Sequence, residues 1–211
     1  MLIKELLDMR DPQRSALVAK RLHQWHTTSL PPNAPPRLFS TIRKWISILP
    51  NNFKPKSPIH TKSWLIELVD SLQPALESVH SSTVFCHNDL LYGNIIYQDG
   101  CARFIDYEYG CPNPRAFDIA NHFCEWAGFE CDYKKYPNEA QQRHFVKNYC
   151  CGGEDVEVVM MEVKLYSPAP HLFWGVWALV QSTISDIDFD YLGYAELRFA
   201  EMESLRSQVG V

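Results

Sequence analysis

Apolar residues are spread through helix-length segments along most of this chain, and proline-rich loops separate the segments. Asp11-Pro12 is a typical helix start, because Asp caps the free backbone N–H groups and Pro fits the first helical position. Three helices are predicted before the first strand, at residues 12–26, 38–49 and 62–79. Pro74 is predicted to interrupt the third of them, because proline lacks the N–H that a helix needs.

A small β-hairpin is predicted in the middle of the chain, after the short strand Thr83–Cys86. Residues 94–98 and 101–106 flank Asp99-Gly100, a dipeptide that favours a tight turn between antiparallel strands. Helices are then predicted to the end of the chain, at residues 116–129, 138–150, 154–166, 169–184 and 190–207. The pattern therefore predicts a predominantly α, α+β fold, built as a single domain over residues 1–211.

The composition is that of a globular protein with one sizeable core. The chain has 211 residues, of which 46% are hydrophobic and 21% charged. Six Trp, ten Tyr and eleven Phe fill part of the core and leave room for an aromatic-lined pocket. The formal net charge of −5 argues against nucleic acid as a partner, because nucleic acid backbones attract positively charged surfaces.

The cysteine pattern and the apolar segments predict a soluble cytoplasmic protein with no membrane insertion. The seven cysteines have no C-x-x-C spacing, so we interpret them as reduced thiols and not as a disulfide framework or a zinc site. Residues 1–8 carry acidic side chains and lack the long apolar run of a signal peptide. The most apolar segment, Leu172–Val180, is too short to span a bilayer.

Three polar motifs contain the candidate chemistry, and they lie at Cys86–Asn94, Phe104–Asp106 and Asp118–Trp126. Phosphoryl transfer from ATP needs a carboxylate that accepts the proton of the incoming hydroxyl, and hard oxygen ligands for a divalent metal. The H-x-D motif supplies a candidate base in Asp89, and Asn94 follows five residues later with an amide oxygen for Mg²⁺. The predicted hairpin returns Asp106 to the same place as the main metal ligand.

Each of these residues has a simpler interpretation when it is taken alone. Asp89 and Asn94 are residue types common in turns, and an aspartate such as Asp106 can cap a loop. Their joint spacing, on either side of a predicted hairpin, favours the catalytic interpretation. His87 is predicted to brace the loop, because Asp89 already supplies the base.

These motifs resemble those of the choline/ethanolamine kinase family, a branch of the protein-kinase fold. The residues that resemble the family are Cys86–Asn94, Ile105–Tyr109, Asn113, Asp118–Trp126, His171–Trp177, Gln181 and Ile187–Tyr194. The resemblance implies the large (C-terminal) lobe of the protein-kinase-like fold, with the small hairpin carrying the catalytic loop. It also implies ATP-dependent phosphorylation of the hydroxyl of ethanolamine or choline with Mg²⁺, the first step of phosphatidylethanolamine or phosphatidylcholine synthesis.

Carried over residue by residue, the resemblance implies Asp89 as the base, and Asn94 and Asp106 at ATP and the metal. It implies four residues around the amine head group: Glu125, Trp174, Trp177 and Tyr194. An ammonium group favours a carboxylate and aromatic ring faces, and tryptophans three residues apart share a helix face. A purely structural core face is the alternative for the tryptophans. Residues 127–137, with Ala-Gly and two acidic side chains, resemble ethanolamine kinases, whereas the preceding Cys-Glu-Trp is closer to choline kinases.

The chain departs from the family pattern at its front. Family members begin with a small lobe that contains a twisted sheet, a phosphate-covering loop and a strand lysine, whereas the first glycine of this chain is Gly93. Residues 1–211 are therefore expected to be a large lobe alone, and the isolated chain is expected to transfer phosphate poorly. A non-catalytic regulatory or pairing module and an aminoglycoside-type phosphotransferase stay open as alternatives, as do a homodimer and a heterodimer.

Overall fold

The computed structural model describes residues 9–211 as a helical protein with two small two-stranded sheets. The segment compared above with a signal peptide, residues 1–8, lies outside the described residues. The α-helices are α1 (Pro12–His26), α2 (Leu38–Ile48), α3 (Lys62–Glu77), α4 (Arg115–Cys124), α5 (Glu139–Cys150), α6 (Val156–Tyr166), α7 (Pro168–Ile184) and α8 (Tyr191–Val209). The strands and short 3₁₀ helices are β1 (Thr83–Cys86), η1 (Tyr92–Asn94), β2 (Ile95–Gln98), β3 (Cys101–Phe104), β4 (Cys111–Pro114), η2 (Glu125–Ala127) and η3 (Tyr133–Lys135).

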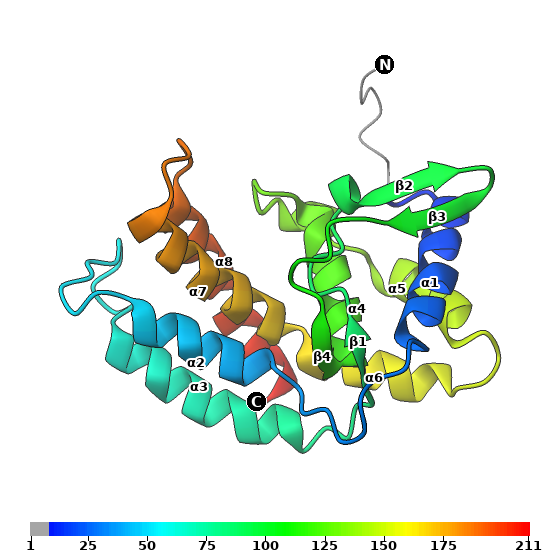
Figure 1. Ribbon diagram of the computed structural model, residues 1–211, viewed down its shortest axis with the longest axis horizontal. Coiled ribbons are helices and arrows are strands. Elements are labelled where there is room, and N and C mark those ends of the chain that lie inside the picture. The colour runs from blue at the N-terminus through cyan, green and yellow to red at the C-terminus, as the bar shows by residue number, and fades with distance from the viewer. Residues whose placement is uncertain (1–8) are drawn as a thin grey trace.

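The helices form two groups around a central layer (Figure 1). Helices α2, α3, α7 and α8 lie on one side, where α7 packs along α8 and also contacts α2. Helices α1, α5 and α6 lie on the other side, and α4 stands between the groups beside the β1–β4 sheet. The β2–β3 hairpin lies against α1. This arrangement confirms the predicted α+β fold with a predominance of helix.

Side-chain caps define where several helices begin. Asp11 accepts the backbone N–H of Arg14 at 2.8 Å, and Pro12 occupies the first position of α1. Asn138 forms a capping box with Gln141 at the start of α5. Because these caps act over three residues of sequence, the predicted starts of α1 and α5 agree with the structure within one residue.

Helix α3 runs through Pro74, so the predicted interruption is wrong. Leu72 and Leu76 on either side of the proline are fully buried and keep both halves of the helix against the core. Pro74 removes the backbone donor that would bond to the carbonyl oxygen of Asp70. Both Asp70 and Pro74 are exposed, so the unpaired carbonyl group lies on the side of the helix that water can reach, and the helix continues.

Strand β4 is an element that the sequence pattern does not predict. It pairs antiparallel with β1, with Cys86 opposite Cys111 and Phe85 opposite Pro112. Prolines disfavour a strand because they cannot donate to the ladder, but a two-stranded sheet leaves one edge of each strand free of pairing. The pairing brings the strand before the H-x-D motif beside the segment that leads into α4.

Helices α7 and α8 approach each other closely at Gly175. A Cβ atom at Gly175 would lie 2.4 Å from Cε1 of Phe199, a distance that real Cβ contacts do not reach. Phe199 is fully buried, so its ring cannot move away without disturbing the core. Gly175 stands between Trp174 and Trp177 in the sequence, and the close approach therefore fixes these two residues relative to α8.

Residues 9–211 contain neither a disulfide bond nor a helix that could span a membrane. All seven cysteine thiols are free, and four of them are buried: Cys86, Cys124, Cys131 and Cys150. Within that range of residues, no helix has both the length and the apolar character that crossing a membrane requires.

Candidate active site

Asp118 fixes the start of the loop that carries Asp89. Its two carboxylate oxygens accept the backbone N–H groups of His87 and Asn88, each at 2.7 Å. One of these oxygens also accepts Nε2–H of His26 at 2.9 Å. Burial opposes the ionisation of Asp118, but the hydrogen bond and charge of His26 and the backbone donors hold its pKa below the usual value. Asp118 is therefore a charged anchor for the loop backbone.

A buried group of three potential metal ligands surrounds this anchor. His26, Cys86 and Asp118 each place one ligand atom within 4.8 Å of the others. Asp118 already accepts three N–H donors, and the Cys86 thiol donates to the carbonyl oxygen of Asn113 at 3.3 Å. Burial raises the pKa of the Cys86 thiol, which keeps it protonated. The group is thus satisfied by hydrogen bonds and braces the loop.

Two further side chains of α4 hold the loop from the same helix face. Asn121 donates to the carbonyl oxygen of Asn88 at 3.0 Å. His122 Nδ1 donates to the carbonyl oxygen of Leu90 at 2.8 Å, and its Nε2 accepts the indole N–H of Trp126 at 3.4 Å. Burial lowers the pKa of His122 to about 4, so the ring stays neutral and keeps one donor and one acceptor.

Asp89 and Asn94 are in direct contact. The amide nitrogen Nδ2 of Asn94 donates to the Asp89 carbonyl oxygen at 2.8 Å and to the Asp89 carboxylate at 3.1 Å. Burial is the main cause that raises the pKa of Asp89, to about 8; the charge of Glu125 adds to it and the hydrogen bond from Asn94 opposes it. A cation bound nearby would lower this pKa, because positive charge favours the carboxylate.

Asp106 comes to the same loop from the end of β3. The backbone N–H of Ile105 donates to the carbonyl oxygen of Asn94 at 3.1 Å. His87 Nε2 donates to the carbonyl oxygen of Ile105 at 3.1 Å, and its Nδ1 accepts the backbone N–H of Asp89 at 3.4 Å. Asp106 itself has a left-handed backbone with φ of 59°, a conformation that aspartate tolerates better than most residues. His87 therefore braces the loop against the hairpin arm that carries Asp106.

The donor set of Asn94 and Asp106 suits Mg²⁺. The Asp106 side chain is exposed, and the amide oxygen of Asn94 accepts no hydrogen bond from the residues that the structure describes. Carboxylate and amide oxygens are hard ligands, and Mg²⁺ binds proteins through one or two such groups while it keeps several waters. The residues present therefore fit this metal.

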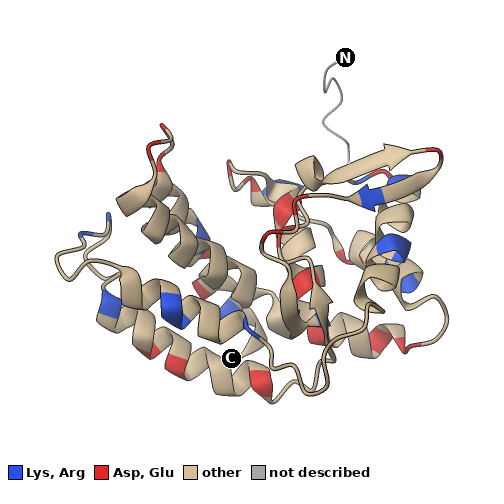
Figure 2. Ribbon diagram, viewed as in Figure 1, with Lys and Arg blue, Asp and Glu red and all other residues tan. Residues whose placement is uncertain are grey.

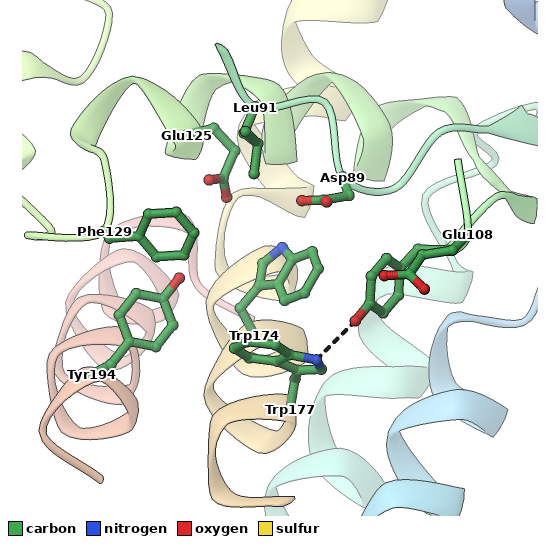
Figure 3. Close-up of a pocket in the computed structure, with 9 residues that line it drawn as sticks. Asp89, Leu91, Glu108, Glu125, Phe129, Trp174, Trp177 and Tyr194 are labelled. Atoms are coloured by element: carbon green, nitrogen blue, oxygen red, sulfur yellow. Dashed lines mark hydrogen bonds between the residues drawn. The ribbon is translucent and has the colours of Figure 1, made fainter. Parts of the chain in front are cut away.

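A cavity of about 150 Å³ lies beside Asp89 (Figure 3). Its lining comes from the Asp89 loop, the β3–β4 connection, η2 and the residues just after it, and helices α7 and α8: Asp89, Leu91, Glu108, Tyr109, Glu125, Phe129, Trp174, Trp177 and Tyr194. The structure thus brings the predicted base together with all four residues predicted around the amine. Asn94 and Asp106 stand outside this lining.

The indole rings of Trp174 and Trp177 form an aromatic surface on one side of the cavity (Figure 3). Their ring centroids are 5.4 Å apart, with the planes at 81°. Trp174 Nε1 donates to Asn121 Oδ1 at 2.7 Å, and Trp177 Nε1 donates to the hydroxyl of Tyr109 at 2.9 Å. Because both indole N–H groups are already bound, the two residues offer ring surface to a ligand and not donors.

Glu125 lies where α4 gives way to η2. The helix predicted for residues 116–129 is longer than α4, which ends at Cys124. The short helix η2 follows, and Gly128, with φ of 66°, then changes the direction of the chain. Glu125 and Phe129 consequently reach the same cavity from either side of this turn (Figure 3). Burial raises the pKa of Glu125, and the charge of Arg198 on α8 opposes the rise.

Four lining residues are missing from the sequence-based site: Leu91, Glu108, Tyr109 and Phe129. Glu108 and Tyr109 belong to the motif Ile105–Tyr109, so their presence in that motif was the signal that could have found them. Phe129 lies in the segment compared with ethanolamine kinases. Leu91 has an apolar side chain in a loop, and nothing in its residue type indicates a site.

Comparison with known proteins gives the family of the chain. The sequence model of the choline/ethanolamine kinase family matches residues 4–203. A probable ethanolamine kinase A of Dictyostelium discoideum is 39% identical over an alignment that covers 95% of this chain and 62% of that protein. A choline/ethanolamine kinase of Mus musculus is 33% identical, with 91% of this chain and 56% of that protein covered. The chain thus spans less than two thirds of the length of these curated relatives.

Solved structures agree with the sequence comparison. A Plasmodium vivax ethanolamine kinase matches with a TM-score of 0.85 and 30% identity, covering 97% of this chain and 63% of that one. A choline kinase from Cryptosporidium parvum matches with a TM-score of 0.80 at 22% identity, which is a likeness of fold. The predicted kinase-like fold is therefore confirmed. Because the family match takes in nearly the whole sequence, the chain belongs to the choline/ethanolamine kinase family.

Proposed function

We propose that this chain binds a small amino alcohol, ethanolamine or choline, and presents its hydroxyl group to ATP for phosphorylation. The observation that supports this most is the cavity that Asp89 shares with Glu125 and Trp174. An ammonium group favours a carboxylate and aromatic faces, and a reacting hydroxyl needs a carboxylate that accepts its proton. A molecule with both groups suits the two parts of this cavity.

The volume of the cavity favours a substrate of few atoms. A volume of about 150 Å³ corresponds to roughly five water molecules, at about 30 Å³ for each water in the liquid. Ethanolamine and choline are of this order. The match of the choline/ethanolamine kinase family to residues 4–203 argues against the aminoglycoside-type alternative.

Asp89 is the proposed base. It orients the hydroxyl group and accepts its proton as the new bond to phosphorus forms. Asn94 holds the Asp89 carboxylate through its amide N–H at 3.1 Å, and Asp118 holds the backbone before it. Asn94 and Asp106 would bind Mg²⁺, which neutralises charge on the phosphates of ATP when it is bound.

The distribution of acidic residues favours a cationic substrate. Three carboxyl groups line the cavity: Asp89, Glu108 and Glu125. Burial raises the pKa values of Asp89 and Glu125, and a cation that enters the cavity lowers them and favours the charged forms. Figure 2 shows further acidic positions on the loop between α7 and α8, residues 185–190, and on the connection between β3 and β4. Charges of one sign around a cleft raise the local concentration of molecules of the opposite sign. An amine therefore reaches this cavity more readily than an anionic alcohol.

Within this class we propose that ethanolamine is preferred over choline. A primary ammonium has three N–H donors and needs oxygen acceptors, whereas a quaternary ammonium has none and needs an aromatic cage. The Glu125 carboxylate and the Tyr194 hydroxyl provide oxygen atoms at one end of the cavity (Figure 3). The acidic residues of segment 127–137 and the 39% identity to a probable ethanolamine kinase A support the same choice.

Amine binding to the purified chain tests this proposal. We expect calorimetry to detect binding of ethanolamine and, more weakly, of choline, and each amine to change the fluorescence of Trp174 and Trp177. Ethylene glycol, which has the hydroxyl but no ammonium group, is the matched control and should not bind. Binding of neither amine would overturn the proposal. Product formation with Mg²⁺ and ATP then separates a catalytic chain from the regulatory or pairing alternative.

A further inference from the structure

Arg198 is a buried cation behind the part of the cavity lining formed by Glu125, Trp174, Trp177 and Tyr194, which we call the wall. It lies on α8 one helical turn after Tyr194, and its side chain is fully buried. Its guanidinium carbon stands 5.5 Å from the centre of the Tyr194 ring, and Nη2 donates to the carbonyl oxygen of Pro170 at 3.3 Å. Arg198 does not line the cavity itself. Burying such a charge is unfavourable unless an opposite charge lies close to it.

Glu125 supplies that opposite charge without a hydrogen bond. Nη2 of Arg198 lies 3.7 Å from Oε1 of Glu125, which is longer than a hydrogen bond. Oε1 of Glu125 and Nε of Arg198 are both buried and have no hydrogen-bond partner in the described part of the chain. The two side chains therefore interact through their charges, and the Glu125 carboxylate keeps its hydrogen-bonding capacity while it lines the cavity.

The other titratable groups around Glu125 come from the Asp89 loop, the β3–β4 connection, α4, the segment before η3, α7 and α8: Asp89, Glu108, Cys124, Cys131, His171 and Tyr194. None of them offsets the burial of a carboxylate. Two are acidic, and burial keeps the two thiols and the phenol protonated by raising their pKa values. Burial and the charge of Arg198 lower the pKa of His171, so the imidazole stays neutral. Arg198 is the positive charge that favours ionised Glu125.

We infer that Arg198 is a positioning residue for the amine: from behind the wall its positive charge, 3.7 Å from Oε1 of Glu125, holds this carboxylate in place for the ammonium group of the substrate. The inference rests on the proposed function, because it needs Glu125 to bind the amine. It assigns a role to a side chain that touches neither substrate nor ATP. Arg198 acts on affinity for the cation and leaves the groups around Asp106 unchanged.

This role has a signature in the pH dependence of binding. In Arg198→Met, Glu125 is left as a buried carboxylate without a counter-charge, so its pKa rises and it takes up a proton at neutral pH. Cation binding needs the ionised form, so affinity is lost near neutral pH and returns as the pH rises through the new pKa. Loss of packing alone would weaken binding by the same factor at every pH.

Calorimetry with choline is the appropriate measurement, because the charge of a quaternary ammonium does not change with pH. For Arg198→Met we expect binding about tenfold weaker than in the parent chain at about pH 7, with the difference shrinking toward about pH 9. Arg206→Met is the matched control, since Arg206 lies on the same helix and its side chain forms hydrogen bonds or ion pairs with Ser71, Glu203 and Val211, away from the cavity. It should leave choline affinity within about twofold of the parent.

A second pair of variants covers the case in which Arg198→Met does not fold. Glu125→Gln removes the charge that Arg198 is inferred to maintain, so choline affinity should fall and lose its dependence on residue 198. The double variant Glu125→Gln/Arg198→Met removes both members of the Glu125–Arg198 charge pair, and we expect its affinity to match that of Glu125→Gln within about twofold. A further clear loss in the double variant would show that Arg198 only shapes the cavity, and the inference would be wrong.

The outcomes separate this inference from the proposed function. If the parent chain binds choline and Arg198→Met binds it equally at every pH, the inference fails and the proposed function stands. If the parent binds neither choline nor ethanolamine, the proposed function fails and the inference falls with it. A pH-dependent loss in Arg198→Met that is absent in the Glu125→Gln background supports both.

Discussion

The loop around Asp89 and the wall around Glu125 meet at one cavity but are held in different ways. The loop is fixed by short, directional hydrogen bonds, above all the two backbone N–H groups that Asp118 accepts at 2.7 Å. The wall depends on packed rings and on the Glu125–Arg198 charge pair at 3.7 Å. Directional bonds tolerate little displacement, whereas charge and ring contacts weaken gradually with distance. In the proposed function, the loop therefore determines where the reaction takes place, and the wall determines which molecule is bound.

Replacement of Asp89 is expected to have the largest effect on the loop side. Asp89→Ala should lower whatever rate of transfer the parent chain shows by about a thousandfold, because the proposed base acts on the hydroxyl during transfer. ATP affinity should change little, since the base contributes little to nucleotide binding. Product formation and nucleotide calorimetry measure the two effects, with the exposed Asp70→Ala as control. Turnover near the parent rate would remove Asp89 from this role.

Replacement of Asp118 tests how the loop is held. Asp118→Ala leaves two buried backbone N–H groups and the ring N–H of His26 without an acceptor, so we expect a loss of about 3 kcal/mol in the free energy of unfolding. Urea denaturation measures this loss. Asp118→Asn keeps one oxygen acceptor and should lose less. If both variants were as stable as the parent, the hydrogen bonds to Asp118 would not be what fixes the loop.

The same carboxylate makes stability depend on pH. The pKa of Asp118 is lower in the folded protein than its usual value, so the unfolded chain takes up the proton first as the pH falls. This contribution is present above about pH 4 and is lost below it, as the pH falls toward the folded pKa. The stability difference between the parent and Asp118→Asn should therefore shrink in acid, which unfolding curves at several pH values measure.

Crowding of Gly175 has an intermediate effect, on the wall side. Gly175→Ala places a Cβ atom against Phe199 and should cost about 2 kcal/mol of unfolding free energy, because the buried ring cannot move freely. Choline affinity should fall as well, since the tryptophans on either side shift relative to α8. The double variant Gly175→Ala/Phe199→Leu should recover part of both losses. No recovery would mean that the close approach at this residue is not the cause.

Loss of one hydrogen bond in the wall is expected to have the smallest effect. Tyr109→Phe removes the partner of the Trp177 indole and leaves both rings in place. Choline affinity should fall by only about threefold, because the aromatic surface remains. Trp177→Phe removes the same bond and part of the ring, and should lose more. A loss of a hundredfold in Tyr109→Phe would show that the wall is as rigidly determined as the loop.

Features that depend on residues close together in the sequence, including those around the Asp89 loop, could be predicted from the sequence pattern. The helix start at Asp11 and the Asp99-Gly100 turn depend on residues a few positions apart, so the sequence pattern locates them. The spacing of Asp89, Asn94 and Asp106 across that hairpin is likewise local. The family motifs supplied the residues of the wall, including Glu125, which no local pattern indicates.

The contacts that fix the site are long-range, and the sequence pattern does not contain them. Asp118 bonds to the loop about thirty residues earlier, and Arg198 meets Glu125 more than seventy residues away. Strand β4 forms in spite of two prolines because β1 supplies its partner. Such contacts depend on how helices pack, which residue spacing along one segment cannot show.

Asn121 joins the two sides of the cavity through a single amide group. Its oxygen accepts the indole N–H of Trp174, and its nitrogen donates to the carbonyl oxygen of Asn88, next to Asp89. The distance between the proposed ammonium position and the proposed base is therefore fixed by a side chain that is fully buried. Amino alcohols with two and with three carbons between nitrogen and oxygen should then bind with similar affinity but react at very different rates, so that selection for chain length acts on turnover.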